Sequence, residues 1–177
     1  MLPNYIGSGL SGLNIQSDQQ NAWLEIYNHT SGTLTNGDIY TYSTLVDITD
    51  SANPIIKAIP VAVSTMATAA VLVGVVDNSV VGEGSILTLK TGWLKIVGCV
   101  QAQCYGGTDI VKGDQLEVLN ASPTAFTMKT SATVTSSVLG TGLILGGNTS
   151  AIALESYATA SNALKWVYLL GHRIVTA

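Results

Sequence analysis

TNGDIYTY, residues 35–42, and VKGDQLEV, residues 111–118, each place a Gly-Asp pair directly before a run of alternating larger apolar residues. Glycine supplies an unusual φ, and a short aspartate side chain caps the adjacent backbone, so the pair is typical of a turn that starts a β-strand. EGSILTL, residues 83–89, follows the same rule with Ser85 in place of the aspartate. Because serine substitutes for aspartate, the pattern predicts turns and not catalytic carboxylates. The strands that follow are expected to bury Tyr40 and Tyr42, Leu87 and Leu89, and Leu116 and Val118.

Period-two alternation extends over much of the chain. It predicts strands in WLEIYN (23–28), DIYTYSTLVDI (38–48), ILTLKTGWLKIVGCV (86–100), QLEVLN (115–120) and AFTMKTSATVTSSV (125–138). Clusters of Gly, Asn, Ser and Pro separate these segments. The sequence therefore predicts an all-β fold, a single β-barrel or β-sandwich of about eight to twelve short strands.

Near the C-terminus, AIALESY and ALKWVYLLGH flank ATASN in the manner of a β-hairpin. A helix over residues 151–163 is the alternative interpretation.

Residues 58–76 carry no charge over nineteen positions, which is the length of a membrane span. The segment also contains Pro60 and Gly74 and is rich in β-branched residues. We expect two short buried strands, near 58–63 and 69–76, and no membrane partner.

Charged residues form only 10% of the 177 residues, while hydrophobic residues form 47%. A surface so poor in charge gives little repulsion between copies, which favours a chain that works in contact with other chains. A secreted, weakly charged β-protein is the alternative. The net charge of -4 and only seven scattered Lys and Arg residues leave no basic stripe for a nucleic acid.

The first 22 residues are nearly uncharged and carry isolated apolar side chains. Such a segment can hardly fold alone, but it can dock as an extended arm on another subunit; a disordered tail is the alternative. The expected organisation is an extended arm over 1–22 and a β-domain over 23–177. The candidate contact residues of the arm are Leu2, Tyr5, Ile6, Leu10, Leu13 and Ile15.

No motif in the chain predicts catalysis or a cofactor site. GSGLSG (7–12) fits the dinucleotide pattern G-x-G-x-x-G, but no strand precedes it and no helix is expected after it. His29 and His172 lack the setting of a catalytic triad or of a zinc site. The turn aspartates, among them Asp109 and Asp114, form no calcium loop. We expect no enzyme activity and no catalytic, cofactor-binding or metal-binding residues.

Cys99 and Cys104 lie in CVQAQC. In an extended segment their sulfurs lie about 16 Å apart on opposite faces, too far for a disulfide. We expect two reduced, packed thiols and folding in a reducing cytosol.

The tryptophans are the best aromatic candidates for an interface, because an indole buries a large area and keeps a polar N–H. Trp93 and Trp166 are predicted to contact another subunit or another protein partner. Core or barrel-rim packing is the alternative for each.

Residues 69–172 resemble the capsid decoration, or head-cement, proteins of tailed bacteriophages. The resemblance lies in the order of five loose segments, which are VLVGVVDNSVVGEGSILTL, GWLKIVGCVQA, DIVKGDQLEV, LGTGLILGG and AIALESYATASNALKWVYLLGH. Residues 1–68 have no counterpart in this resemblance.

The resemblance implies a structural, non-enzymatic subunit, made in the host cytoplasm, that trimerises on the outer surface of the virion. Its partners would be the major capsid protein and two further copies of itself, and its effect would be capsid stabilisation. Two other functions remain open at this point: a tail or fibre module that binds a host-surface glycan, and a small hydrolase built on Asp38 and Asp114.

Overall fold

The computed structural model describes residues 4–5, 15–18, 20–47, 55–61, 73–119, 125–128 and 150–171. These residues confirm the all-β prediction, since their only helical element is a single 3-10 turn, η2 (Asn78–Val81). The strands are β1 (Asn4–Tyr5), β2 (Ile15–Ser17), β3 (Ala22–Tyr27), β4 (Leu34–Thr35), β5 (Ile39–Asp47), β6 (Ile55–Val61), β7 (Val73–Val76), β8 (Ser85–Ile86), β9 (Thr91–Tyr105), β10 (Gln115–Leu119), β11 (Ala125–Met128), β12 (Ala151–Ala153) and β13 (Asn162–Leu170).

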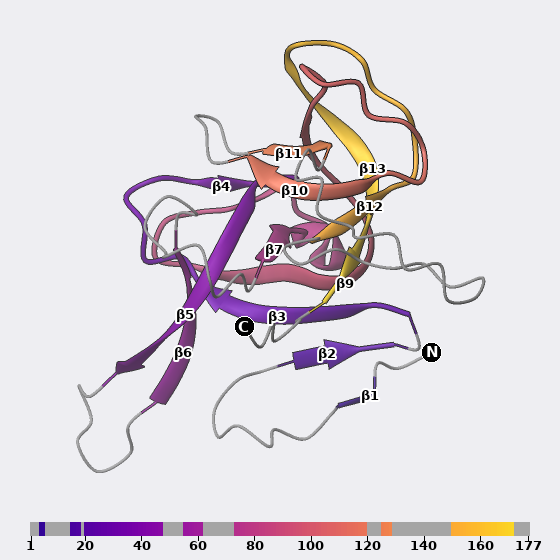
Figure 1. Ribbon diagram of the computed structural model, residues 1–177. Helices are drawn as coiled ribbons and strands as arrows, with labels where there is room; N and C mark the ends of the chain where they lie inside the picture. The colour runs from indigo at the N-terminus through magenta and orange to yellow at the C-terminus, as the bar shows by residue number, and fades with distance from the viewer. Residues whose placement is uncertain are drawn as a thin grey trace, which may run out of the picture.

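Within the described residues, eleven strands form one continuous sheet, and β4 and β8 form a separate two-stranded ladder. The pairings close five strands of the sheet into a barrel, in the order β3-β6-β5-β7-β9 and back to β3. We call this barrel the N-terminal ring. Its strands β5 and β6 continue outward as a paired ribbon (Figure 1).

A second closed circuit runs β9-β11-β10-β12-β13 and back to β9, and we call it the C-terminal ring. When the five strands of each ring are numbered in chain order, their spatial order around both rings is first, third, second, fourth, fifth. In both, the first and third strands are parallel, and all other neighbours are antiparallel. The described strands therefore contain one five-stranded arrangement twice, with β9 shared between the two copies.

Strand β9 is the last strand of the N-terminal ring and the first strand of the C-terminal ring. It pairs with β3 as far as Val97 and with β13 from Val97 onward. Gly98 follows at this change of partner with φ 103°, where a Cβ atom would lie 2.7 Å from the Gln20 carbonyl oxygen. A side chain would be strained and obstructed here, so glycine lets one strand serve both rings.

Each ring has its own buried apolar cluster. Leu24, Ile26 and Leu94 belong to the cluster of the N-terminal ring, and Leu116 and Phe126 belong to that of the C-terminal ring. Two residues of N-terminal ring strands, Ile39 of β5 and Val75 of β7, join the second cluster. The two rings are thus packed together as well as linked by β9.

The two strands expected within residues 58–76 are present as β6 and β7. They do not pair with each other, because β5 lies between them in the sheet. No helix among the described residues is long and apolar enough to cross a membrane. The hairpin expected near the C-terminus is also confirmed, as β12 paired with β13, so the helix alternative for 151–163 is wrong.

Both cysteines are free and lie on β9. Cys104 is buried in the C-terminal cluster, and this burial raises the pKa of its thiol to about 12. Cys99 is exposed, which corrects the expectation that both thiols are packed. It lies on the opposite face of β9, because five steps along an alternating strand reverse the side.

Part of the expected arm lies on its own chain. Strand β2, which contains Ile15, pairs with β3, and β1, which contains Tyr5, pairs with β2 (Figure 1). Leu2, Ile6, Leu10 and Leu13 lie outside the described residues, as do GSGLSG and His172. The contact of the arm with another subunit stays a prediction.

Candidate functional site

The connection from β7 to β9, residues 77–90, presents the largest run of exposed apolar side chains in the described chain. Val80, Val81, Leu87 and Leu89 expose between 44% and 60% of their surface. Leu87 and Leu89 were expected to be buried in a strand, and that expectation is wrong. Strand β8 ends at Ile86, and the chain then turns, with Leu89 at φ 59°.

The buried Asn28 holds this turn in place. Its backbone N–H donates to the Lys90 carbonyl, and its carbonyl accepts from the Leu89 N–H, each at 2.9 Å. Its side-chain amide donates to the Ile86 carbonyl at 3.0 Å and to the Gly32 carbonyl at 2.9 Å. A leucine in the left-handed region costs about 1–2 kcal/mol, so these bonds maintain a strained turn that displays two leucines.

Two further asparagines order the first half of the connection. The Asn78 side-chain amide donates to the Ser85 carbonyl at 2.9 Å and to Glu83 Oε2 at 2.8 Å. Asn36 Oδ1 accepts from the Asn78 backbone N–H at 2.9 Å. The apolar side chains are therefore carried by a hydrogen-bonded scaffold, which reduces the entropy lost when a partner covers them.

The equivalent connection in the C-terminal ring runs from β12 to β13, residues 154–161. Its tip consists of Ala158, Thr159 and Ala160, which are exposed but small. The half-buried Tyr157 instead anchors the connection, bridging to Ile110 and donating its hydroxyl to the Ser161 carbonyl at 2.8 Å. The same position in the duplicated unit thus lacks the exposed large apolar groups of the β7–β9 connection.

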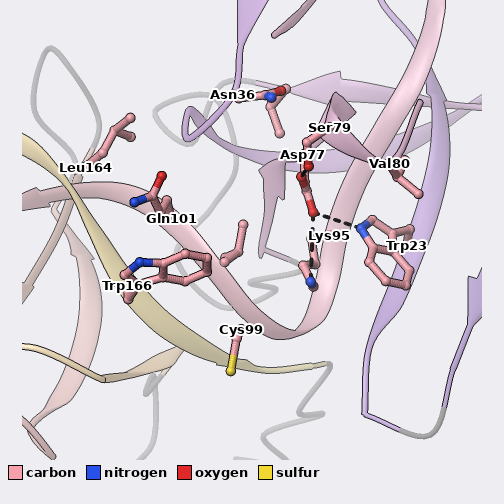
Figure 2. A pocket seen from close by; sticks show the side chains of 12 residues that line it. Trp23, Asn36, Asp77, Ser79, Val80, Lys95, Cys99, Gln101, Leu164 and Trp166 are labelled. Carbon is pink, nitrogen blue, oxygen red and sulfur yellow. Dashed lines mark hydrogen bonds and ion pairs between the residues drawn. The ribbon is translucent and has the colours of Figure 1, made fainter. Parts of the chain in front are cut away.

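A groove of about 350 Å³ lies where the two rings meet. We call it the junction groove; β3, β7, η2 and β9 contribute one part of its lining, and β13 and the second half of β9 the other (Figure 2). The residues that matter for its chemistry are Trp23, Asp77, Ser79, Lys95, Gln101 and Trp166.

The Asp77 carboxylate contacts three other side chains in the first part of the groove. Its Oδ2 accepts from Trp23 Nε1 at 3.0 Å and lies 3.8 Å from Lys95 Nζ (Figure 2). The Ser79 hydroxyl donates to its other oxygen. Lys95 Nζ also lies 4.5 Å from the centroid of the Trp23 ring, a cation–π contact.

Lys95 is buried although it carries an ammonium group. Desolvation by burial lowers the pKa of this group, and the negative charge of Asp77 acts in the opposite direction. The ion pair with Asp77 therefore compensates only part of the cost of burying this ammonium group.

Trp166 and Gln101 form the other part of the groove. They are direct partners in the ladder between β13 and β9, and Trp166 exposes 47% of its surface. The Gln101 side chain is exposed and makes no hydrogen bond within the described residues. This part of the groove thus offers an open indole beside an unused amide.

No match was found for this chain among protein-family models, curated proteins or solved structures.

Of the two tryptophans expected to make contacts, only Trp166 is available on the surface. Trp93 exposes 9% of its surface and is part of the core of the molecule. Its ring offers little area to a partner. Trp23, which the sequence also offered as an aromatic interface candidate, is the second tryptophan of the groove.

The two Gly-Asp pairs are turns, as expected. Gly37 and Gly113 have φ of 95° and 97°. Asp38 Oδ2 accepts from the Thr35 N–H at 2.8 Å, and Asp114 Oδ2 accepts from the Val111 N–H at 2.7 Å. Both carboxylates cap their own turns, and neither lines the junction groove.

The described residues contain no group of three or more His, Cys, Asp or Glu that could hold a metal ion. His29 is exposed on a turn, as the sequence indicated.

The sequence did not reveal the Asp77–Lys95 pair. One signal was present: Lys95 alternates with Trp93 and Val97 in an otherwise apolar strand, a position that a charged residue occupies only with a partner. The identity of that partner depends on the pairing of β7 with β9, which brings Val76 opposite Leu94.

Proposed function

We propose that this protein is a structural subunit that docks on a protein lattice through its β7–β9 connection. The observation that carries the proposal is the contrast between the two rings. A strained, hydrogen-bonded scaffold displays four large apolar side chains in one ring, and the equivalent connection in the other ring displays none. Exposed apolar groups on an ordered loop are typical of a surface that a partner covers.

The lattice that best fits the sequence is the outside of a tailed-bacteriophage head. On this proposal the protein is a capsid decoration protein, a homotrimer that binds the major capsid protein and cements neighbouring capsid subunits at the virion surface. A trimer gains apparent affinity of about 100- to 10,000-fold by avidity, so each copy needs only a small contact. Four apolar side chains per copy are consistent with such a contact, and the net charge of -4 keeps free subunits soluble.

The arm contributes a second expected contact. Residues 1–22 reach a neighbouring subunit on this proposal, with β1 as the outermost strand of the described sheet. An outer strand has unpaired backbone groups on one edge, which can pair with a strand of a neighbour.

The experiment mixes purified protein with expanded, undecorated capsids and measures bound protein against concentration. We expect saturable binding in the micromolar range or below, and heads that retain their DNA to a higher temperature. Light scattering of the free protein measures whether the trimer forms before docking.

The double variant L87S/L89S tests the docking surface directly. Because both side chains are exposed, the fold should be retained, while apparent capsid affinity should fall by at least about tenfold. Val111→Ser is the matched control, since Val111 is 57% exposed but lies at a turn of the C-terminal ring. Absence of wild-type binding at micromolar protein, or equal losses in the two variants, would contradict the proposal.

A further inference from the structure

We propose that the junction groove binds a neutral mono- or disaccharide, with Trp166 as the stacking platform and Gln101 as the hydrogen-bonding partner. This function differs from capsid docking, which Leu87 and Leu89 carry, although the two sites adjoin at Val80 of the β7–β9 connection, which also lines the groove (Figure 2). The proposal assigns to Trp166 a small-molecule ligand in place of the protein contact expected from the sequence.

The open part of the groove has the chemistry that a sugar ring requires. A sugar ring has apolar C–H faces and hydroxyl groups around its edge, so an exposed indole can cover one face while an amide binds adjacent hydroxyls. Trp166 and Gln101 lie directly opposite each other in the β9–β13 ladder. The amide provides both a donor and an acceptor, and neither is used within the described residues.

The remainder of the groove favours an uncharged occupant. The one ammonium and the one carboxylate among its lining residues, Lys95 and Asp77, form an ion pair with each other. The same carboxylate also accepts hydrogen bonds from Trp23 and Ser79, so it has little capacity left for a ligand. A charged ligand would therefore find no free counter-charge in the groove.

The backbone around Trp166 argues against an extended peptide as the occupant. A peptide that adds to a sheet needs free N–H and C=O groups. The Trp166 N–H donates to Glu155 Oε1 at 2.8 Å, and its carbonyl accepts from the Leu154 N–H at 3.0 Å. Since β13 lies between β9 and β12, recognition in this groove must use side chains.

The size of the groove agrees with this class of ligand. Sites for small molecules usually enclose about 300–1,000 Å³, and the groove, at about 350 Å³, lies near the lower end. A mono- or disaccharide fits this range, whereas a longer chain would have to extend beyond the lining residues.

Nuclear magnetic resonance of the ¹⁵N-labelled full chain tests the proposal. Glucose, N-acetylglucosamine, maltose and cellobiose are titrated separately at millimolar concentrations. We expect at least one of them to shift the indole resonance of Trp166 and the side-chain amide resonances of Gln101 in a saturable manner. The indole resonance of the buried Trp93 should not shift, and it serves as the internal control.

Two variants place the binding site. Trp166→Ala removes an exposed side chain and should weaken binding by about tenfold, the value of an aromatic contact. Gln101→Leu keeps the size of the side chain and should also weaken binding, while Val111→Ala, outside the groove, should leave it unchanged.

Three outcomes would overturn the proposal. One is the absence of a saturable shift at Trp166 with all four sugars. Another is a larger shift with a charged sugar such as N-acetylneuraminic acid. The third is a loss of capsid binding in Trp166→Ala, which would make the groove a protein contact. Because the docking variants lie at Leu87 and Leu89, failure of one proposal leaves the other intact.

Discussion

The N-terminal and C-terminal rings are built on the same circuit of five strands, but their fourth and fifth strands are joined in different ways. In the N-terminal ring the connection of residues 77–90 includes a 3-10 turn, a short strand and a strained turn at Leu89. In the C-terminal ring residues 154–161 form a shorter connection with small exposed residues, Ala158, Thr159 and Ala160, at its tip. The repeated strands thus supply stability, whereas the connections between them can vary without loss of the fold.

The rings also differ in how tightly their equivalent Gly-Asp turns are packed. Gly37 donates its N–H to the Val76 carbonyl and accepts from the Gln103 N–H, and Leu164 lies against it. Gly113 makes the equivalent bond to Ala153, but no atom lies within 4 Å of the position that a Cβ would take. The turn at Gly37 therefore contacts both rings, whereas the turn at Gly113, among the described residues, bonds only within the C-terminal ring.

The largest expected effect comes from the two cores. Leu24→Ala in the N-terminal ring and Leu116→Ala in the C-terminal ring each remove a fully buried side chain, at a cost of about 2–5 kcal/mol in unfolding free energy. Because β9 belongs to both rings, we expect either variant to lower the stability of the whole molecule in one transition.

Denaturant unfolding, followed by hydrogen exchange at amides of each ring, measures this coupling. Two separate transitions, with protection lost in only the altered ring, would mean that the rings are independent units.

The next largest effect separates the two glycine turns. Gly37→Ala places a methyl group 2.2 Å from Cδ2 of the exposed Leu164, which must shift, at a residue with φ 95°, so we expect a loss of about 1–3 kcal/mol. Gly113→Ala carries the same backbone strain without the clash and should cost about 1–2 kcal/mol. Chemical denaturation of both variants gives the difference. Equal losses would show that Gly37 has no special part in joining the rings.

Alternation along the chain predicted most of the strands, because a sheet with one buried face imposes a period of two on its residues. The duplication was not predicted. The sequence showed Gly-Asp pairs before two strands, but it also showed a third, similar segment at Ser85, whose spacing concealed the repeat. In the structure that segment belongs to the β7–β9 connection and has no equivalent in the second ring.

The site was harder to predict than the fold. Leu87 and Leu89 fit the pattern of buried strand residues, and only the bonds from Asn28, which is distant in sequence, turn the chain so that both are exposed. Trp166 could be proposed from its residue type alone. Its partner Gln101 could not, since the register of β9 against β13 places them together.

A smaller effect concerns Lys95, which is buried in the N-terminal ring. Lys95→Met keeps much of the side chain's apolar contact and removes an ammonium whose burial outweighs its ion pair with Asp77, so we expect a gain in stability of about 1 kcal/mol or less at neutral pH. Lys165→Met is the matched control, since Lys165 Nζ lies 5.0 Å from the centroid of the Tyr157 ring in the C-terminal ring.

The pH dependence of the unfolding free energy gives a second measurement on Lys95. Burial lowers the pKa of Lys95 below its usual value of 10.5, so the unfolded chain keeps this proton at pH values where the folded protein releases it. The unfolded state then binds more protons, and wild-type stability rises with pH through the window that ends near 10.5. Lys95→Met should lack this contribution. If the unfolding free energies of the variant and the wild type changed equally with pH, Lys95 would not be the group that titrates in this window.

The smallest effect compares the two turn aspartates. Asp38→Asn and Asp114→Asn each keep a side-chain oxygen that can accept the capping hydrogen bond, so each should cost about 1 kcal/mol or less.

Desolvation raises the pKa of the half-buried Asp38 above 3.8, although the bond from Thr35 opposes this. Between 3.8 and the raised pKa the folded protein binds more protons than the unfolded chain, so this carboxyl makes the wild type less stable as pH rises through that window. Asp38→Asn should therefore gain stability relative to wild type between acidic and neutral pH, which thermal unfolding at a series of pH values measures. A relative loss over the same range would mean that the charged form of Asp38 is stabilised by the turn, and that its carboxylate does more than cap a β-strand.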